Sequence, residues 1–97
     1  MKLSLMTRYR SKKWLARVRE EPCLICGSPY TVAHHVMFTA PAAMSLKVPD
    51  DKTVPLCTPH HMELHMDGNE RRWWAKQGVD PEEWISKFES EVTDLKR

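Results

Sequence analysis

A predicted amphipathic helix occupies the N-terminal part of the chain. Its apolar side is formed by Trp14, Leu15 and Val18. Residues three or four positions apart lie on the same side of a helix, so this spacing favours a helix over a strand. Thr7 or Ser11 can cap the N-terminus of this helix, which runs to about Arg19. Pro22 then prevents the helix from continuing.

Two later stretches have the composition of β-strands. Residues 30–38 and 53–56 are rich in β-branched and aromatic side chains, which favour an extended backbone. The segment 23–29 precedes the first predicted strand and contains a glycine and a proline, which predict a tight turn. A loop with prolines and acidic residues, 39–52, separates the two predicted strands.

Three further helices are predicted after the second strand. The first begins with Thr58, which is followed by a proline, and runs to about Asp67 before a glycine. The second spans 69–77, and the third begins after Asp80, which is a favourable N-cap. The apolar face of the third helix is formed by Trp84, Phe88, Val92 and Leu95. We expect the tryptophans to lie in the core rather than to stack on bases.

The overall composition is that of one small domain without a membrane segment. The chain has 97 residues, a mass of 11.4 kDa, 29% charged side chains and a mean hydropathy of -0.56. No apolar run approaches the ~18 residues of a transmembrane helix, and the N-terminal residues lack the apolar region of a secretory signal. We therefore expect a soluble, cytoplasmic protein. A chain of this length often needs a metal or a disulfide to supplement its core.

Positive charge is concentrated in the N-terminal part of the sequence. Residues 1–19 contain seven Lys or Arg and no acidic residue, whereas the remainder contains eight basic and thirteen acidic residues. This asymmetry predicts an arm that contacts a polyanion; the alternative is that these charges form only a solvated helix face. The candidate phosphate contacts are Arg8, Arg10, Lys12 and Lys13 in the arm, and Lys47, Lys52, Arg71 and Arg72 further along.

Three cysteines and one histidine have the spacing of a metal site. Cys23 and Cys26 are separated by two residues, and so are Cys57 and His60. Zinc takes four such ligands in a tetrahedron, and a two-residue gap lets one turn direct two side chains at the same ion. Three cysteines cannot all pair in disulfides. We therefore predict one structural zinc ion here; the alternative is that the cysteines are buried and free.

The five histidines are grouped between positions 34 and 65. His61 and His65 are four residues apart, so they share one side of the predicted helix. His34 and His35 are neighbours on the predicted strand, where successive side chains point to opposite faces. Either His34 or His35 can therefore bind a metal, while the other histidine has a different role. The alternatives are a second structural metal or surface histidines; a metalloprotease is disfavoured because Met62, not glutamate, follows His61.

Together, these motifs resemble the HNH endonucleases of the ββα-metal kind, especially the zinc-containing branch found in phages and bacteria. The resemblance covers about residues 22–68 and rests on C-x-x-C, H-H and C-x-x-H-H-x-x-x-H in this order. It implies an α+β fold with a small ββα-metal core, a zinc knuckle and flanking helices. In that fold, residues 1–21 form a basic helix or arm, 22–68 form the core, and 69–97 form helices that pack on it.

The resemblance also implies roles for four of the histidines. His34, His61 and His65 would bind one catalytic divalent metal, and His35 would be the general base. The reaction would be the attack of water on a DNA phosphodiester bond. Three imidazoles suit Zn, Ni, Co or Mn better than Mg, although Mg also fits because the phosphate supplies oxygen ligands.

One position departs from the family pattern. The family's middle Asn, five residues before the strand-end cysteine, corresponds to Lys52 here. That Asn braces the loop beside the general base, so the bracing must come from another residue. Asp50 or Asp51 can supply it through hydrogen bonds to the loop or to His35.

Two other functions compete with the nuclease. A non-catalytic zinc-binding module for DNA or RNA would need no second, unligated imidazole beside His34, and a protein-interaction domain would use the acidic C-terminal helix. The nuclease interpretation predicts double-stranded DNA as the partner and a bacterial or phage-infected cell as the setting. It also predicts little sequence specificity, because no element resembles a major-groove reader. It does not identify a recruiting protein.

Overall fold

The computed structural model describes residues 9–39 and 48–96, and within these ranges the chain forms four α-helices and two β-strands. In chain order they are α1 Lys12–Arg19, β1 Thr31–His35, β2 Thr53–Cys57, α2 Thr58–Asp67, α3 Glu70–Gln77 and α4 Pro81–Glu91. Two short 3-10 helices, Met37–Thr39 and Thr93–Lys96, follow β1 and α4. The predicted α+β class is confirmed. None of the helices in the described residues could span a lipid bilayer.

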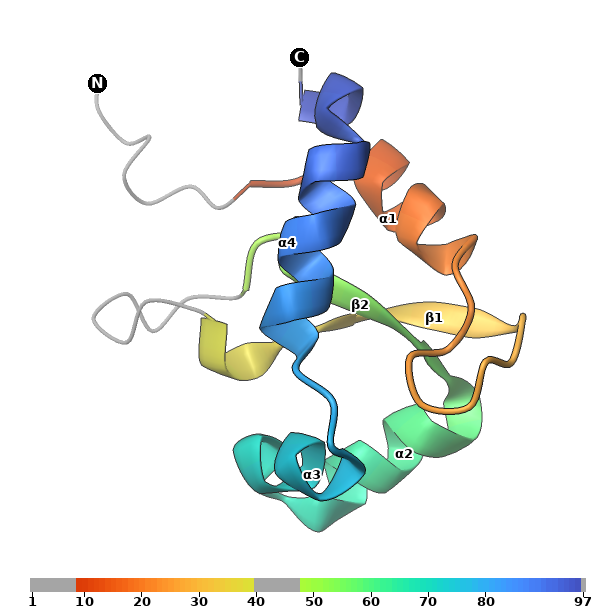
Figure 1. Ribbon diagram of the computed structural model, residues 1–97, viewed down its shortest axis with the longest axis vertical. Helices are drawn as coiled ribbons and strands as arrows, with labels where there is room; N and C mark the ends of the chain where they lie inside the picture. The colour runs from red at the N-terminus through yellow and green to blue at the C-terminus, as the bar shows by residue number, and fades with distance from the viewer. Residues whose placement is uncertain (1–8, 40–47, 97) are drawn as a thin grey trace.

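The two strands form an antiparallel pair between α1 on one side and α2 and α3 on the other (Figure 1). Thr31 pairs with Cys57 at one end of the ladder, and His35 pairs with Thr53 at the other. All five residues of β2 are buried, whereas β1 is mostly half-buried. β2 therefore lies deepest in the fold, and its last residue leads directly into α2.

β1 is shorter than the predicted strand 30–38. The backbone amide of Val36 still donates to the carbonyl of Lys52 at 3.0 Å, but Met37–Thr39 then turns into a 3-10 helix. The facing segment turns at the same point, because the amide of Lys52 donates to the carbonyl of Pro49 at 3.1 Å. A strand extends only as far as its partner, and the composition of 30–38 does not reveal where the partner ends.

Two clusters of buried side chains hold the elements together, and α4 contributes to both. One lies between α1 and α4 and contains Trp14, Val18, Phe88 and Val92. In it, the rings of Trp14 and Phe88 meet edge to face with centroids 5.5 Å apart. The other joins the sheet to α2 and α3 and includes Val54, Leu56, Leu64, Trp73, Trp74 and Ile85. The prediction of core tryptophans is confirmed, because three of the four are buried and Trp84 packs, partly buried, against both clusters.

The helix boundaries agree with the predicted caps except at α2. Ser11 caps α1 by accepting the amide N–H of Trp14 at 3.1 Å, and Asp80 caps α4. The N-cap of α2 is Cys57 rather than Thr58, and its side chain makes no capping hydrogen bond. Thr58 lies inside the helix because β2 extends to Cys57 and passes into α2 without a loop. This junction brings the end of the strand and the first turn of the helix together.

Candidate metal centres

Two turns bring three cysteines and a histidine together. The first turn, between α1 and β1, carries Cys23 and Cys26; the second, where β2 passes into α2, carries Cys57 and His60. Gly27 closes the first turn with a φ of 78°, and its amide donates to the carbonyl of Cys23 at 2.9 Å. The amide of Leu24 donates to the carbonyl of Pro55 at 3.1 Å, which attaches the first turn to β2.

The four ligand atoms lie close enough together to bind one metal ion. The Sγ atoms of Cys26 and Cys57 are 3.7 Å apart, and Nδ1 of His60 lies 3.1 Å from Sγ of Cys57. Nδ1 of His60 also lies 3.9 Å from Sγ of Cys23, and all four ligand atoms fall within 4.8 Å of one another. With Zn–S bonds of about 2.3 Å, two sulfur ligands of a tetrahedron are about 3.8 Å apart. These four residues could therefore hold a metal ion, and three sulfurs with one imidazole suit zinc.

The thiols of Cys23 and Cys57 differ in their pKa values. Burial raises the pKa of Cys23, but backbone hydrogen bonds, first among them the one to Cys57, outweigh burial and lower the pKa from 9.0 to about 6. Burial is the main cause of the raised pKa of Cys57, and a backbone hydrogen bond to His60 opposes it. The sulfur of Cys23 is therefore a thiolate at neutral pH, which is the form that binds a metal.

Three imidazoles form a second cluster, in which His34 of β1 meets His61 and His65 of α2. The Nε2 atoms of His61 and His65 are 3.0 Å apart, and one nitrogen from each ring lies within 4.8 Å of the other two. The ring centroid of His34 is 5.0 Å from that of His61 and 5.7 Å from that of His65. His34 is 3% exposed, whereas His65 faces solvent. The cluster can therefore hold a metal by three nitrogens and leave a position open.

The pKa of His61 is lowered from its ordinary value of 6.5. Burial is the main cause, and repulsion from His34 and His65 adds to it, while the carboxylate of Glu70 opposes it. The lowered pKa keeps the imidazole of His61 neutral at pH 7, and neutral imidazole is the form that binds a metal.

Glu70, the first residue of α3, contacts this cluster although no sequence motif includes it. Its Oε2 lies 2.8 Å from Nε2 of His34 and accepts the indole N–H of Trp74 at 2.9 Å, and its Oε1 accepts the amide N–H of Met37 at 3.1 Å. Burial raises the pKa of Glu70, but the hydrogen bonds, led by the one to His34, outweigh burial and lower the pKa. His34 lies 36 residues earlier in the chain, so no local spacing points to this pair.

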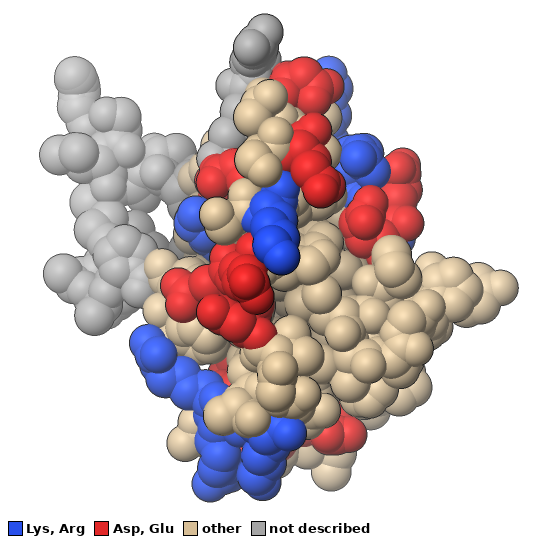
Figure 2. All heavy atoms as spheres, viewed as in Figure 1, with Lys and Arg blue, Asp and Glu red and all other residues tan. Residues whose placement is uncertain are grey.

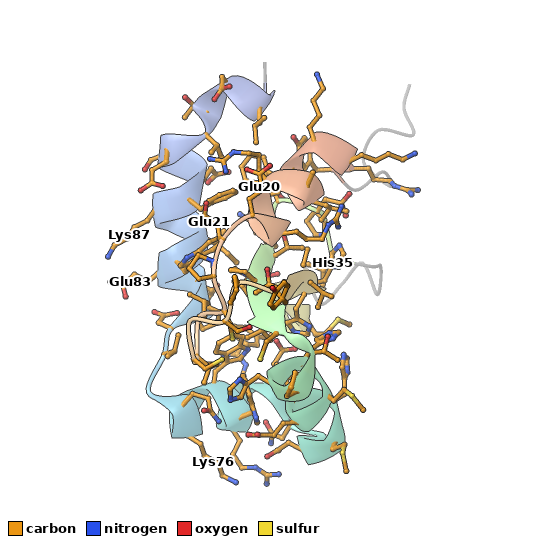
Figure 3. All side chains as sticks on the ribbon, turned by 90° about the vertical axis from the view of Figure 1, so that its right-hand side faces the viewer. Glu20, Glu21, His35, Lys76, Glu83 and Lys87 are labelled. Carbon is orange, nitrogen blue, oxygen red and sulfur yellow. The ribbon has the colours of Figure 1, made fainter. Side chains whose placement is uncertain are left out.

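His35 has surroundings different from those of His34. Its Nε2 lies 2.9 Å from Oδ1 of the buried Asp50, and its side chain is 32% exposed. Oδ2 of Asp50 accepts the amide N–H of Ser11 at 2.9 Å, so one carboxylate joins His35 to the start of α1. Of the two acids expected to brace this loop, Asp50 therefore contacts His35. Figure 3 shows His35 on the side of the molecule opposite α4.

Six of the eight candidates for phosphate contacts, those outside α3, do not share one environment. Three are exposed at the start of α1: Arg10, Lys12 and Lys13. Two lie outside the described residues: Arg8 and Lys47. Lys52 is half-buried and lines a hollow beside α4 together with Glu82 and Glu89. Its surroundings are therefore partly acidic.

On the face drawn in Figure 2, basic residues gather on α3 and acidic residues gather on α4. The exposed basic residues of α3 are Arg71, Arg72 and Lys76. Arg72 and Lys76 lie 2.7 and 3.8 Å from the carboxylate of Asp67, and the hydrogen bond from Arg72 is the main cause of the lowered pKa of Asp67. The guanidinium of Arg71 lies over the ring of Phe38, 4.4 Å from its centroid. Acidic residues gather along α4, and that face is unfavourable for a polyanion.

The fold and the two clusters define a small α+β protein whose described residues contain two candidate metal centres. The chain belongs to the family described as a protein of unknown function, DUF968, whose model matches residues 1–93. It is also similar to the uncharacterized protein YdfU of Escherichia coli strain K12, with 37% identity over 67 residues. That match covers 69% of this chain and 19% of YdfU, so the chain spans about a fifth of this relative. No solved structure matches the chain significantly.

Proposed function

We propose that this protein is a metal-dependent endonuclease of the HNH type, which hydrolyses phosphodiester bonds of double-stranded DNA with little sequence preference. The main support is the difference between two neighbouring imidazoles on β1. His34 meets two further histidines, whereas His35 meets a carboxylate and solvent. A nuclease of this kind needs a metal ligand and a separate base at one place.

The catalytic divalent cation is held by His34, His61 and His65 in this proposal. The support is the gathering of their ligand atoms within 4.8 Å and the exposure of His65, which leaves one side of the cluster open. Nitrogen ligands favour Zn, Ni, Co or Mn over Mg. When bound, the cation supplies positive charge that stabilises the charge developing on the phosphate in the transition state.

His35 takes the proton from the attacking water. Asp50 accepts the hydrogen on Nε2 of His35, which leaves Nδ1 of the neutral imidazole as the acceptor for the water proton. The same carboxylate stabilises the imidazolium that forms. Water and substrate reach His35 more easily than the buried His34, because the side chain of His35 is 32% exposed.

The start of α1 supplies phosphate contacts beside His35. The carboxylate of Asp50 bonds both to His35 and to the amide of Ser11, which ties the helix start to the imidazole. Arg10 and Lys12, on either side of Ser11, are exposed. Such charges bind the DNA backbone without reading its sequence. The acidic α4 lies on the other side of the molecule (Figure 3).

The cluster of Cys23, Cys26, Cys57 and His60 holds a structural zinc ion in this proposal. Its ligands join the turn before β1 to the junction of β2 and α2. His60 and His61 are adjacent, so this zinc ion also fixes the first turn of the helix that carries two ligands of the catalytic centre. The bound metal adds folding free energy to a domain with a small core.

Nicking of a supercoiled plasmid tests this function. The full chain, with zinc in the cysteine cluster and an added divalent metal from the series above, should nick the plasmid, and His35→Ala should nick it about 10²–10⁴-fold more slowly. Lys87→Ala is a matched control on the α4 side and should nick at the wild-type rate. A wild-type protein that binds DNA but nicks with none of the metals would instead be a non-catalytic nucleic-acid-binding module.

A further inference from the structure

We infer that Glu70 is a positioning residue: its carboxylate holds the Nε2–H group of His34 and thereby leaves Nδ1 of His34 as the atom that binds the cation. This inference rests on the proposed function and deepens it, because it names a residue outside the family motif. Glu70 contacts neither DNA nor the reacting atoms in this scheme. Its effect reaches the metal centre only through the orientation of the His34 ring.

Three nitrogen atoms from other residues contact the carboxylate of Glu70. It lies beside Nε2 of His34 at 2.8 Å and accepts the N–H groups of Trp74 at 2.9 Å and of Met37 at 3.1 Å. The side chains of His34 and Glu70 are 3% and 10% exposed, so little water competes for these contacts. A carboxylate fixed in this way is a rigid acceptor for the imidazole N–H.

The position of Glu70 in the fold adds to this rigidity. It is the first residue of α3, directly after the N-cap Asn69, whose side chain accepts the amide N–H of Arg72 at 3.0 Å. Trp73 and Trp74 in the same helix turn are buried in the core. The backbone at Glu70 is therefore anchored independently of His34.

The chemistry of imidazole explains what this contact does. A neutral imidazole carries one N–H donor and one nitrogen that binds metals, and a partner on one nitrogen decides which is which. Glu70 is a hydrogen-bond acceptor at neutral pH, so Nε2 of His34 carries the hydrogen. Carboxylates that contact metal-binding histidines in this manner typically raise metal affinity about 10- to 100-fold.

The competing role for Glu70 is that of a fourth metal ligand. Among the described residues, the group whose ligand atoms gather within 4.8 Å comprises His34, His61 and His65 and does not include Glu70. Both oxygens of Glu70 also accept N–H groups from other residues. These two observations favour a supporting carboxylate over a ligand.

Cobalt titration of the full chain, with zinc already in the cysteine cluster, tests the inference. Glu70→Gln should weaken Co²⁺ binding at the histidine centre about 10- to 100-fold. Glu63→Gln is a matched control, because Glu63 also accepts an indole N–H, that of Trp73 at 3.0 Å, but is not in contact with His34. Equal Co²⁺ affinities for the two variants would overturn the inference.

Nitrogen NMR of the histidine rings in the wild-type protein provides a second test that needs no variant. Before the histidine centre is loaded, His34 should be the Nε2–H tautomer, and ¹¹³Cd²⁺ added to the centre should couple to Nδ1 of His34. An Nδ1–H tautomer, or coupling to Nε2, would overturn the inference. If the wild-type protein takes up no cadmium at the histidines, the proposed catalytic centre fails, while the tautomer of His34 still decides the role of Glu70.

Discussion

His35 is joined to Asp50 by a hydrogen bond of 2.9 Å that links β1 to the loop before β2. The other oxygen of Asp50 accepts the amide N–H of Ser11, and the amide of Asp50 donates to the carbonyl of Tyr9 at 2.8 Å. One buried carboxylate thus holds the imidazole and the start of α1 in a single arrangement. In the proposed nuclease, this arrangement decides which nitrogen of His35 faces the water.

His35→Ala should remove most of the cleavage without the loss of either metal. The expected fall in rate is about 10²–10⁴-fold, the usual effect of losing a general base. His35 belongs to neither cluster of ligand atoms, so metal content and the melting temperature should stay close to wild type. Nicking rates measured beside calorimetric metal titration check both parts.

His34→Ala and His65→Ala should weaken metal binding, whereas His35→Ala should leave it unchanged. Each removes one imidazole from the histidine cluster, so the second metal should bind more weakly and excess metal should restore part of the activity of His65→Ala. The cysteine cluster should keep its zinc, because its ligands are distinct. If His35→Ala lost the second metal while His34→Ala kept it, the two roles would be exchanged.

Asp50→Asn should slow cleavage, but by less than His35→Ala. The amide oxygen can still accept the N–H of Ser11, whereas the amide nitrogen turns a donor toward His35 and favours the wrong tautomer of the imidazole. Metal content should not change. Single-turnover cleavage at saturating DNA measures the effect, and a wild-type rate would show that this carboxylate does not orient the base.

Cys26→Ser should destabilise the whole domain by several kcal/mol or unfold it, because metal binding and folding are coupled in small metal-binding domains. Cys26 itself is exposed, so its own packing contributes little to this loss. Thr58→Ala is a suitable control, since Thr58 is exposed and lies between Cys57 and His60 in sequence. Zinc content and thermal melting measure the outcome, and a variant with wild-type values of both contradicts the zinc assignment.

The metal-free protein should become more stable as the pH rises from 7 to 9. The pKa of Cys23 is 9.0 in its ordinary state and about 6 in the fold, so the unfolded chain binds more protons than the folded chain across this range. This contribution is complete above pH 9 and is lost as the pH falls toward 6. The raised pKa of Cys57 acts in the opposite sense, but only above pH 9.

Urea unfolding in the presence of a chelator and a thiol reductant measures this dependence at pH 7 and pH 9. Cys23→Ser should remove the rise in the urea midpoint, and Thr58→Ala should keep it. The lowered pKa of Cys23 is contradicted if the wild-type midpoint responds to pH no more than that of Cys23→Ser.

Much of the fold follows from patterns within short stretches of sequence. The cap at Asp80 depends on residues a few positions apart, which is why it could be predicted. The predicted apolar face was only partly right, because α4 ends at Glu91, before Val92 and Leu95, and because the buried Ile85 was not part of the prediction. The cysteine cluster is similar to the cap, because one turn and one strand–helix junction each direct two ligands. Bringing the two halves of the cysteine cluster together required that the two predicted strands pair, and the histidine cluster also required α2 to pack against β1.

Contacts between residues far apart in sequence could not be predicted from local patterns of this kind. The meeting of Glu70 with His34 depends on how α3 packs, and that of Asp50 with Ser11 depends on where α1 begins. The length of β1 likewise depends on its partner, since the facing segment turns away before Thr53. The spacing of residues within a motif does not predict contacts between distant segments or the length of a strand.

Neutralising the basic residues of the N-terminal part of the chain should weaken DNA binding equally for unrelated sequences. The variant carries glutamine at four basic positions: Arg8, Arg10, Lys12 and Lys13. Each phosphate contact that is lost should reduce the slope of log affinity against log salt by about 0.9. Fluorescence anisotropy with two duplexes of different sequence, measured over a salt series, gives both the affinity and the slope.

Lys12 and Lys87 form a matched pair for this test. Both are exposed lysines on helices, but Lys87 lies 4.0 Å from Glu83 on α4, on the side opposite His35 (Figure 3). Lys12→Gln should flatten the salt dependence and Lys87→Gln should not, because a charge on the acidic helix makes no phosphate contact. Equal slopes for the two variants would place the DNA on another surface, and the exposed Arg71 of α3 would then be the next charge to neutralise.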